Sequence, residues 1–228
     1  MERRLDQDLD RVRQMLLKMG GMVEGMVAQA TQSLLDRNDQ LSTDVIAGDT
    51  EIDHLEIEID ELCHLILGTK QPTAVDLRFL VAVMKINGDL ERIGDSAVNI
   101  AQSVLQLNDQ PPLKPYIDLP HLSQLVQDMV RKSLDAFVRR DARLATEVCQ
   151  SDDAVDGLYK QLFRELLTYM MEDPKTVSRA LHLLLISRNM ERIADHATNI
   201  AEDVIYYVEG RDIRHSSGLS EEAARKAV

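Results

Sequence analysis

Aromatic residues are scarce in this sequence: they make up 4% of the chain, and tryptophan is absent. Glycine and proline are also few, with ten and six residues among 228, which argues against an all-β fold and its many tight turns. The two cysteines, Cys63 and Cys149, stand among apolar neighbours and match neither a disulfide framework nor a zinc spacing. The abundant residues are leucine, alanine, methionine, isoleucine and charged residues, a composition typical of a helical protein with a packed core.

Basic residues are outnumbered, with 26 against 39 acidic ones and a net charge of −13 at pH 7. A surface with this much negative charge repels phosphate backbones, and we therefore expect no nucleic acid partner. The sequence has no run approaching the roughly 20 apolar residues of a membrane span, and its charged beginning lacks the apolar stretch of a signal peptide. We therefore expect a cytoplasmic protein that associates with a membrane only through its partners.

Prolines divide the chain into long helical segments. Pro72 and Pro174 stand alone, and the other four prolines lie within 111–120. Between them, apolar residues recur every three or four positions, as in amphipathic helices. Thr73 with Asp76 and Asp173 before Pro174 are helix-start signals. We expect six helices, near 4–37, 40–67, 73–108, 119–140, 142–171 and 174–209, which predicts an all-α fold.

The chain is an internal duplication. Residues 26–60 align with 129–163 without a gap, at an offset of 103. Residues 91–104 align with 191–204 at an offset of 100, and nine of these fourteen positions are identical. Between the two blocks the first half carries three extra residues. Each half is therefore a three-helix unit, and the two units are expected to be pseudo-symmetric.

Each half carries two acidic pairs spaced four residues apart, which places both members of a pair on one helix face. The eight carboxylates are Asp49, Asp53, Glu91 and Asp95 in the first half and Asp152, Asp156, Glu191 and Asp195 in the second. A turn near Asp173 leaves Asp156 seventeen residues before it and Glu191 eighteen after it, so antiparallel helices would bring the two pairs level. The first half does likewise once its extra residues are removed. The sequence thus predicts two carboxylate quartets, called here the first and the second quartet.

Clustered carboxylates repel one another, because like charges four residues apart on a helix cost about 0.2–0.5 kcal/mol per pair. A bound cation relieves that repulsion, and all-oxygen ligands suit Mg²⁺, Ca²⁺, Mn²⁺ or iron. Zinc is less natural without a cysteine or a well-placed histidine, although His54 and His196 adjoin two of the aspartates.

Helical geometry predicts that the quartets face outward. Glu91 and Asp95 point about 125–165° away from the apolar seam that begins at Leu90 and Ile93. Ferritin-like di-iron proteins differ, because their ligands project into the bundle core. A solvated acidic surface is the competing interpretation. Both halves, however, keep the Glu, the Asp and an asparagine (Asn99 and Asn199) where the surrounding surface positions differ.

The doubled motif, Leu/Met-Glu-Arg-Ile-Gly/Ala-Asp followed by Asn-Ile at 90–100 and 190–200, closely resembles the PhoU family. Members of that family are accessory proteins of the bacterial phosphate-specific transport system. The stretch Glu-Gly-Arg-Asp-Ile-Arg-His at 209–215 is similar too, and the resemblance spans about 5–215. It implies PhoU-like three-helix bundles over 1–108 and 121–215, a linker over 109–120 and a loose tail over 216–228.

The resemblance also implies a function. The family's acidic motif, Glu or Asp, three residues, then Asp, maps onto all four pairs, and Ala194 in place of Gly94 alters packing rather than the ligands. In some members such carboxylates hold multinuclear iron or zinc clusters, and in others magnesium or manganese. PhoU-like proteins restrain phosphate uptake and phosphate-starvation signalling through the transporter's ATPase subunit and a membrane sensor histidine kinase. We expect this chain to act likewise, as a homodimer.

Three interpretations follow from the residues and the resemblance. The first is a metal-binding regulatory adaptor with no catalytic residues. The second is an enzyme in which a carboxylate-bridged metal cluster performs phosphoester hydrolysis or redox chemistry. The third is a plain helical scaffold with acidic faces. Against the enzyme, the sequence has no evident general acid or base beyond the ligands themselves.

Overall fold

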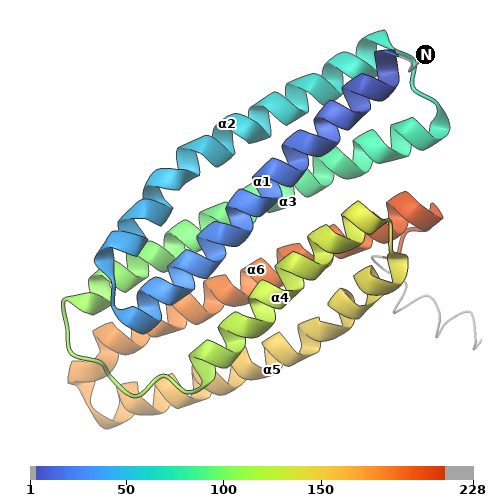
Figure 1. Ribbon diagram of the computed structural model, residues 1–228. Helices are drawn as coiled ribbons and strands as arrows, with labels where there is room; N and C mark the ends of the chain where they lie inside the picture. The colour runs from blue at the N-terminus through green and yellow to red at the C-terminus, as the bar shows by residue number, and fades with distance from the viewer. Residues whose placement is uncertain (1–3, 214–228) are drawn as a thin grey trace, which may run out of the picture.

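Six α-helices form nearly all of this protein, whose computed structural model describes residues 4–213 (Figure 1). They are α1 (Arg4–Asp36), α2 (Asp39–Thr69), α3 (Ala74–Asn108), α4 (Asp118–Arg139), α5 (Ala142–Glu172) and α6 (Val177–Glu209), with a 3₁₀ turn, η1 (Pro174–Thr176), before α6. The expected all-α fold is confirmed. None of the helices in the described part of the chain is long and apolar enough to cross a membrane. The tail expected at 216–228 lies outside the described residues.

The connection between the halves is shorter than the expected 109–120. Helix α4 begins at Asp118, so Pro120 lies in its first turn. Proline is tolerated there because the first N–H groups of a helix have no partner within the helix. The connection is therefore 109–117. The side chains of Lys114 and Glu165 form an ion pair that fastens this connection to α5.

The two halves turn between their first and second helices in the same way. Arg37 and Arg140, which are 103 residues apart, both adopt left-handed backbone conformations with φ of 53° and 52°. The next residues, Asn38 and Asp141, each accept two backbone N–H groups of the following helix through a side-chain oxygen. Such caps satisfy donors that the helix leaves free. The duplication is therefore visible in backbone geometry as well as in sequence.

The predicted helix starts after the two lone prolines are also present. The Asp76 carboxylate accepts hydrogen bonds from the Thr73 N–H at 3.2 Å and the Thr73 hydroxyl at 2.7 Å. Asp173 accepts the Lys175 N–H at 2.9 Å. The difference from expectation is that the first turn after Asp173 is the 3₁₀ turn η1, so α6 proper begins at Val177. Tight 3₁₀ turns are common at such helix ends.

The helices pack in two layers. Helices α2, α3, α6 and α5 lie side by side in that order, and α1 and α4 cover one face of this layer (Figure 1). Helices α1–α3 form one bundle and α4–α6 the other, and the broadest contact between bundles is the antiparallel pair α3–α6. No helix within residues 4–213 covers the opposite face of the four-helix layer, along which the α2–α3 and α5–α6 seams run (Figure 1).

The core runs continuously through both bundles. The apolar seams of α3 and α6 are buried, and their residues are Leu90, Ile93, Ala97, Ile100, Val104 and Leu107, with Met190, Ile193, Ala197, Ile200, Val204 and Tyr207. An aromatic cluster of Phe79, Phe137 and Tyr207 joins α3, α4 and α6, with ring centroids 5.7–6.2 Å apart. Three of the eight aromatic residues therefore pack together where the two bundles meet, and their contacts join the bundles.

Candidate metal centre

The second quartet gathers along the seam between α5 and α6. The charge of Asp195 raises the pKa of Asp152, and the charge of Asp156 raises the pKa of both. Thr198, one turn after Asp195, donates a 3.5 Å hydrogen bond to Asp152 across the seam. The antiparallel register predicted from the turn near residue 173 is therefore present.

Glu191 is the exception to the predicted outward orientation. It is only 8% exposed, whereas Asp195 is exposed and Asp152 and Asp156 are half-buried. The Arg188 guanidinium binds Glu191 Oε1 at 2.7 Å, and Arg188 itself stacks over the Tyr159 ring. Glu191 Oε2 is buried with no hydrogen-bond partner among the described residues. An unpaired buried carboxylate oxygen costs free energy, so this atom is suited to a ligand.

The pKa values in the second quartet are raised by burial and by mutual repulsion. Burial is the largest cause of the raised pKa for Asp152, Glu191 and Asp195. For Glu191 the next cause is the charge of Asp195, which Arg188 partly offsets. For Asp195 the opposing influences are the neighbouring Arg188 and His196. The ionised carboxylates therefore repel one another in the folded protein, and a bound cation would reduce that repulsion.

The first quartet lies along the seam between α2 and α3. Burial, and then the charges of Asp53 and Asp95, raise the pKa of Asp49. Burial and the charge of Asp95 likewise raise the pKa of Glu91, and Glu56 contributes to the same effect. Glu56 was not among the predicted ligands. It lies three residues after Asp53, and that spacing could have indicated it.

The Gly94/Ala194 difference between the copies changes packing. A Cβ added to Gly94 would stand 3.6 Å from Ile52 and 3.9 Å from Asp49 Oδ1, both ordinary van der Waals distances. The carboxylate positions of the first quartet therefore do not depend on glycine at 94.

Two cations beside the second quartet were not predicted. Lys160 binds Asp156 at 2.7 Å, and Arg188 binds Glu191. Their spacings of four and three residues from these acids are the signal that sequence reasoning could have used. Within residues 4–213, no ion pair reaches a carboxylate of the first quartet. The two quartets therefore share their motif but differ in their surroundings.

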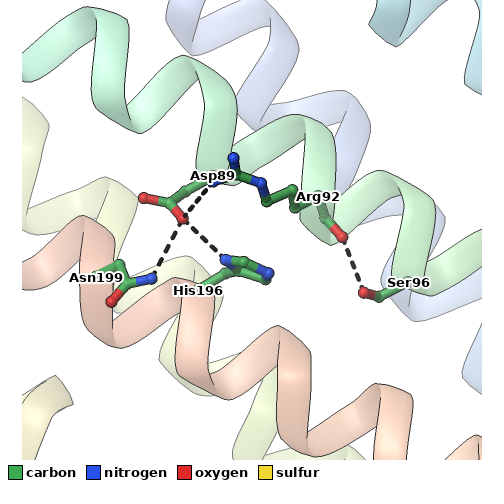
Figure 2. A network of polar contacts seen from close by, with 5 residues as sticks. All are labelled: Asp89, Arg92, Ser96, His196 and Asn199. Carbon is green, nitrogen blue, oxygen red and sulfur yellow. Dashed lines mark hydrogen bonds and ion pairs between the residues drawn. The ribbon is translucent and has the colours of Figure 1, made fainter.

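His196 and Asn199 face the other bundle rather than the second quartet. Figure 2 shows both side chains directed at Asp89 of α3, with His196 Nδ1 at 2.8 Å and Asn199 Nδ2 at 3.3 Å from Asp89 Oδ1. Arg92 lies 3.9 Å from the same oxygen. Asp89 is 6% exposed, whereas Arg92 and Asn199 are exposed, so a buried carboxylate lies at the centre of a network whose rim meets solvent. It fixes α6 against α3 beside the second quartet.

The donor set fits a hard cation, although the side chains are not arranged around one. The described residues contain no group of three or more His, Cys, Asp or Glu side chains positioned to hold an ion as they stand. Two observations favour a cation nonetheless: the buried unpaired oxygen of Glu191 and the raised pKa values in both quartets. Asp152 and Asp195 also line an open cleft of about 490 Å³.

Comparisons with known proteins agree with the duplication. The model of the PhoU domain matches residues 16–104 and again 119–204. The phosphate-specific transport system accessory protein PhoU homolog of Pseudomonas aeruginosa is 46% identical over 209 residues, which cover 91% of this chain and 86% of that protein. The homolog of Aquifex aeolicus is 43% identical over 212 residues, covering 93% and 96%.

Solved structures agree as well. The crystal structure of PhoU from Pseudomonas aeruginosa superposes with a TM-score of 0.89 at 45% identity, covering 91% of this chain and all of that one. The phosphate transport system regulatory protein PhoU from Streptococcus pneumoniae superposes with a TM-score of 0.84 at 27% identity, covering 92% and 99%. Sequence, helix arrangement and repeated domain therefore lead to one conclusion: the chain belongs to the PhoU family.

Proposed function

We propose that this protein is a metal-binding regulatory adaptor that restrains phosphate uptake and phosphate-starvation signalling. The observation that carries the proposal is the pair of carboxylate quartets on the open face of a PhoU-family fold. Relatives in this family are named as accessory or regulatory proteins of phosphate transport, which supports a regulatory role. The proposed contacts are the ATPase subunit of the phosphate transporter and a membrane sensor histidine kinase.

Metal would be held by the two quartets. Asp49, Asp53, Glu91 and Asp95 would serve one site, and Asp152, Asp156, Glu191 and Asp195 the other. Iron, zinc, magnesium and manganese are the candidate ions, singly or as clusters, and oxygen donors favour the harder ones. A bound cation would supply positive charge that neutralises the carboxylates. In the second site Arg188 already holds one oxygen of Glu191 and leaves the other free.

The face that carries the carboxylate quartets suits an adaptor function better than an enzymatic one. The cleft beside Asp152 and Asp195 is open, whereas catalytic sites depend on excluding water around the reacting groups. The polar groups that border it are engaged in structural contacts, with His196 bound to Asp89 and Thr198 to Asp152. A broad, charged, open face is suited to docking another protein. A metal-dependent phosphohydrolase or redox enzyme is the alternative.

Contacts made by these carboxylates, directly or through a cation, should depend on charge. We expect the purified protein to bind the isolated ATPase subunit or the cytoplasmic kinase domain with an affinity that falls as salt rises. Neutralising Glu191 and Asp195 should weaken this binding. Such an adaptor would act in the cytoplasm, as a homodimer, and would reach the membrane through its partners.

Metal content tests the ligand assignment. Replacing Glu91 with Gln and Asp95 with Asn should remove about half of the bound metal, since one of two quartets is disabled. The measurement is elemental analysis of protein dialysed against manganese or iron. Full retention of metal in this variant would show that the ligands are wrongly assigned.

Gene deletion separates the adaptor from the enzyme. Loss of the gene should derepress phosphate-starvation genes in medium rich in phosphate, and the intact gene should restore repression. The enzyme alternative is correct instead if deletion leaves that response unchanged and the purified, metal-loaded protein hydrolyses phosphate esters.

A further inference from the structure

An exposed apolar surface covers the hairpin formed by α5 and α6. We call it the hairpin patch, and its residues are Phe163, Leu167 and Met171 of α5 with Val177, Leu181 and Leu185 of α6. Their exposed fractions run from 42% to 78%. Arg188 stacks over Tyr159 at 5.8 Å, which fixes the antiparallel register and sets Phe163, Leu167 and Met171 level with Leu185, Leu181 and Val177. Exposed apolar patches of this kind mark interaction sites.

The first bundle repeats only part of the patch. The positions equivalent to Phe163, Leu167 and Met171 are occupied by Asp60, His64 and Gly68, and the position equivalent to Leu185 by Lys85. Apolar residues are kept at the other two positions, where Leu77 and Val81 correspond to Val177 and Leu181, and Leu77 is 44% exposed. The fold of the hairpin is the same in both halves, so its packing does not require apolar side chains at the four positions that differ. The apolar side of α5 is therefore a property of the second half.

The rim of the hairpin patch is basic, although the chain is strongly acidic. Between residues 159 and 188 there are five basic residues and three acidic ones, but Lys160 and Arg188 are bound to Asp156 and Glu191 of the second quartet. The basic residues left beside the patch are Arg164, Lys175 and Arg179, against the acidic Glu172 and Asp173. The acidic Glu165 is bound to Lys114. Within residues 4–213, Arg164 and Lys175 make no ion pair. Arg164, with Tyr159, Lys160 and Phe163, lines a surface pocket of about 450 Å³ at the inner end of the patch.

We propose that the hairpin patch docks an amphipathic helix of a partner protein whose apolar face is flanked by Asp or Glu residues. This proposal rests on the adaptor function and gives it a docking site and a partner chemistry. Helices commonly bind in this way, with apolar residues spaced three or four apart lying along a groove between two helices. The opposite charge on the flanks would steer the encounter and fix the register.

The spacing of the patch limits what can bind. Its three levels are four residues apart along α5, about 6 Å each. A partner helix would place apolar residues at i, i+4 and i+7 against them. The aromatic side chain of Phe163 and the adjoining pocket suit a large apolar residue at one end of that series. Acidic residues of the partner would lie beside Arg164 at that end and beside Lys175 at the other.

Charge argues against a second copy of this chain as the occupant. A two-fold pairing would bring one basic rim against another, which repels. An anionic membrane carries the same sign of charge as an acid-flanked helix, so binding to phospholipid vesicles is the measurement that separates these two occupants.

Two designed peptides test the proposal on the full-length protein. Both are fluorescein-labelled 18-residue helices with the same leucine face, one flanked by glutamates and the other by lysines. Fluorescence anisotropy should show the glutamate peptide binding at least tenfold more tightly than the lysine peptide. The double variant Leu167→Asp/Leu181→Asp should lose at least tenfold in affinity. Its matched control, His64→Asp/Val81→Asp at the equivalent places in the first bundle, should bind like the original protein.

Other outcomes overturn the proposal. Equal binding of both peptides, or unchanged binding by the double variant with a native circular-dichroism spectrum, would show that the hairpin patch is not the docking site. Leu167→Ser/Leu181→Ser carries the same prediction if the aspartate variant does not fold. Binding to anionic phospholipid vesicles that the double variant loses would identify a membrane site. A dimer in light scattering that the double variant makes monomeric would identify a second copy.

The proposal can fail while the adaptor function stands. If the double variant still binds the ATPase subunit or kinase domain, and still restores repression in the deletion strain, the adaptor function survives and the docking site lies elsewhere. If the peptide results hold but deletion leaves the starvation response unchanged, the hairpin patch binds helices and the adaptor function is wrong.

Discussion

Neutralising the second quartet should stabilise the metal-free protein, which is the reverse of the usual effect of changing a buried residue. The variant is Glu191→Gln with Asp195→Asn. It removes the like-charge pair of Glu191 and Asp195 within α6, whose repulsion costs about 0.2–0.5 kcal/mol. It also removes the repulsion from Asp152 and Asp156 across the seam, which costs about 0.2–1 kcal/mol for each partly exposed pair. The glutamine amide oxygen introduced by Glu191→Gln still accepts a hydrogen bond from Arg188, but losing the charge costs about 0.5 kcal/mol.

The net gain is about 1 kcal/mol, which raises the melting temperature of a chain of this length by about 2–4 °C. The assay is thermal unfolding by circular dichroism at pH 7.5 in EDTA. The control is Asp10→Asn with Asp128→Asn, which makes the same change in net charge. Because each of these aspartates is paired at 2.6 Å with an arginine three residues on, the control should melt at the same temperature as the original protein or slightly below it.

The effect should also depend on pH. Because the folded-state pKa of Asp152, Glu191 and Asp195 is raised, the folded protein binds protons more readily than the unfolded chain. The stability contributed by these protons is fully present below the ordinary values of 3.8 and 4.5 and is lost as pH rises through the folded pKa. The difference in melting temperature should therefore be widest at pH 7.5 and shrink toward pH 4.

A neutral variant that melts at or below the original protein in EDTA would refute this reasoning, because the carboxylates would then not be repelling one another. Adding Mn²⁺ provides a second comparison. It should raise the melting temperature of the original protein more than that of the variant, since only the original keeps a complete second quartet.

Three further results are expected. Replacing Asp89 with Ala should lower the free energy of unfolding by about 1–3 kcal/mol in urea titrations, because His196 and Asn199 lose their shared partner. Arg92→Ala, whose side chain is exposed, should cost less than about 1 kcal/mol. Phe79→Ala should cost about 3–5 kcal/mol in the same titrations, because it opens the aromatic cluster between the bundles; a smaller loss would show that the bundles are held together elsewhere. Burial raises the pKa of Cys63 to about 12 and that of Cys149 to about 11, so a thiol reagent at pH 8 should label neither in the folded protein and both in urea.

Local signals in the sequence predicted most of the fold. The seams of α3 and α6 could be found because apolar spacing of three and four residues requires only the periodicity of a helix. The helix starts at Thr73 and Asp173 could be found because a capping side chain acts within three residues of its own position. The internal repeat then supplied a second copy of the acidic pairs and of the helix seam at equivalent positions of the other half, so each helix was supported twice.

Features that depend on contacts between distant segments could not be predicted. Arg188 binds Glu191 on α6 and stacks over Tyr159 of α5, and this contact across the seam has no counterpart in a helical wheel, which places Glu191 only by its angle. The bond between Asp89 and His196 joins residues 107 apart, and nothing in the sequence pairs them. His196 adjoins Asp195 in the sequence, but its side chain binds Asp89 of the other bundle (Figure 2).

The two quartets share a motif, yet electrostatics makes them unequal. In the second, Lys160 and Arg188 already neutralise part of the carboxylate charge, so an incoming cation has less repulsion to relieve. In the first, Glu56 adds negative charge, and Arg92 offsets part of the repulsion at Glu91 without an ion pair to the quartet within residues 4–213. If the quartets bind a cation as proposed, the one with fewer paired carboxylates, the first, should hold it more tightly. Duplication thus preserved the acidic motif, while substitutions one helical turn away changed its surroundings independently in the two halves.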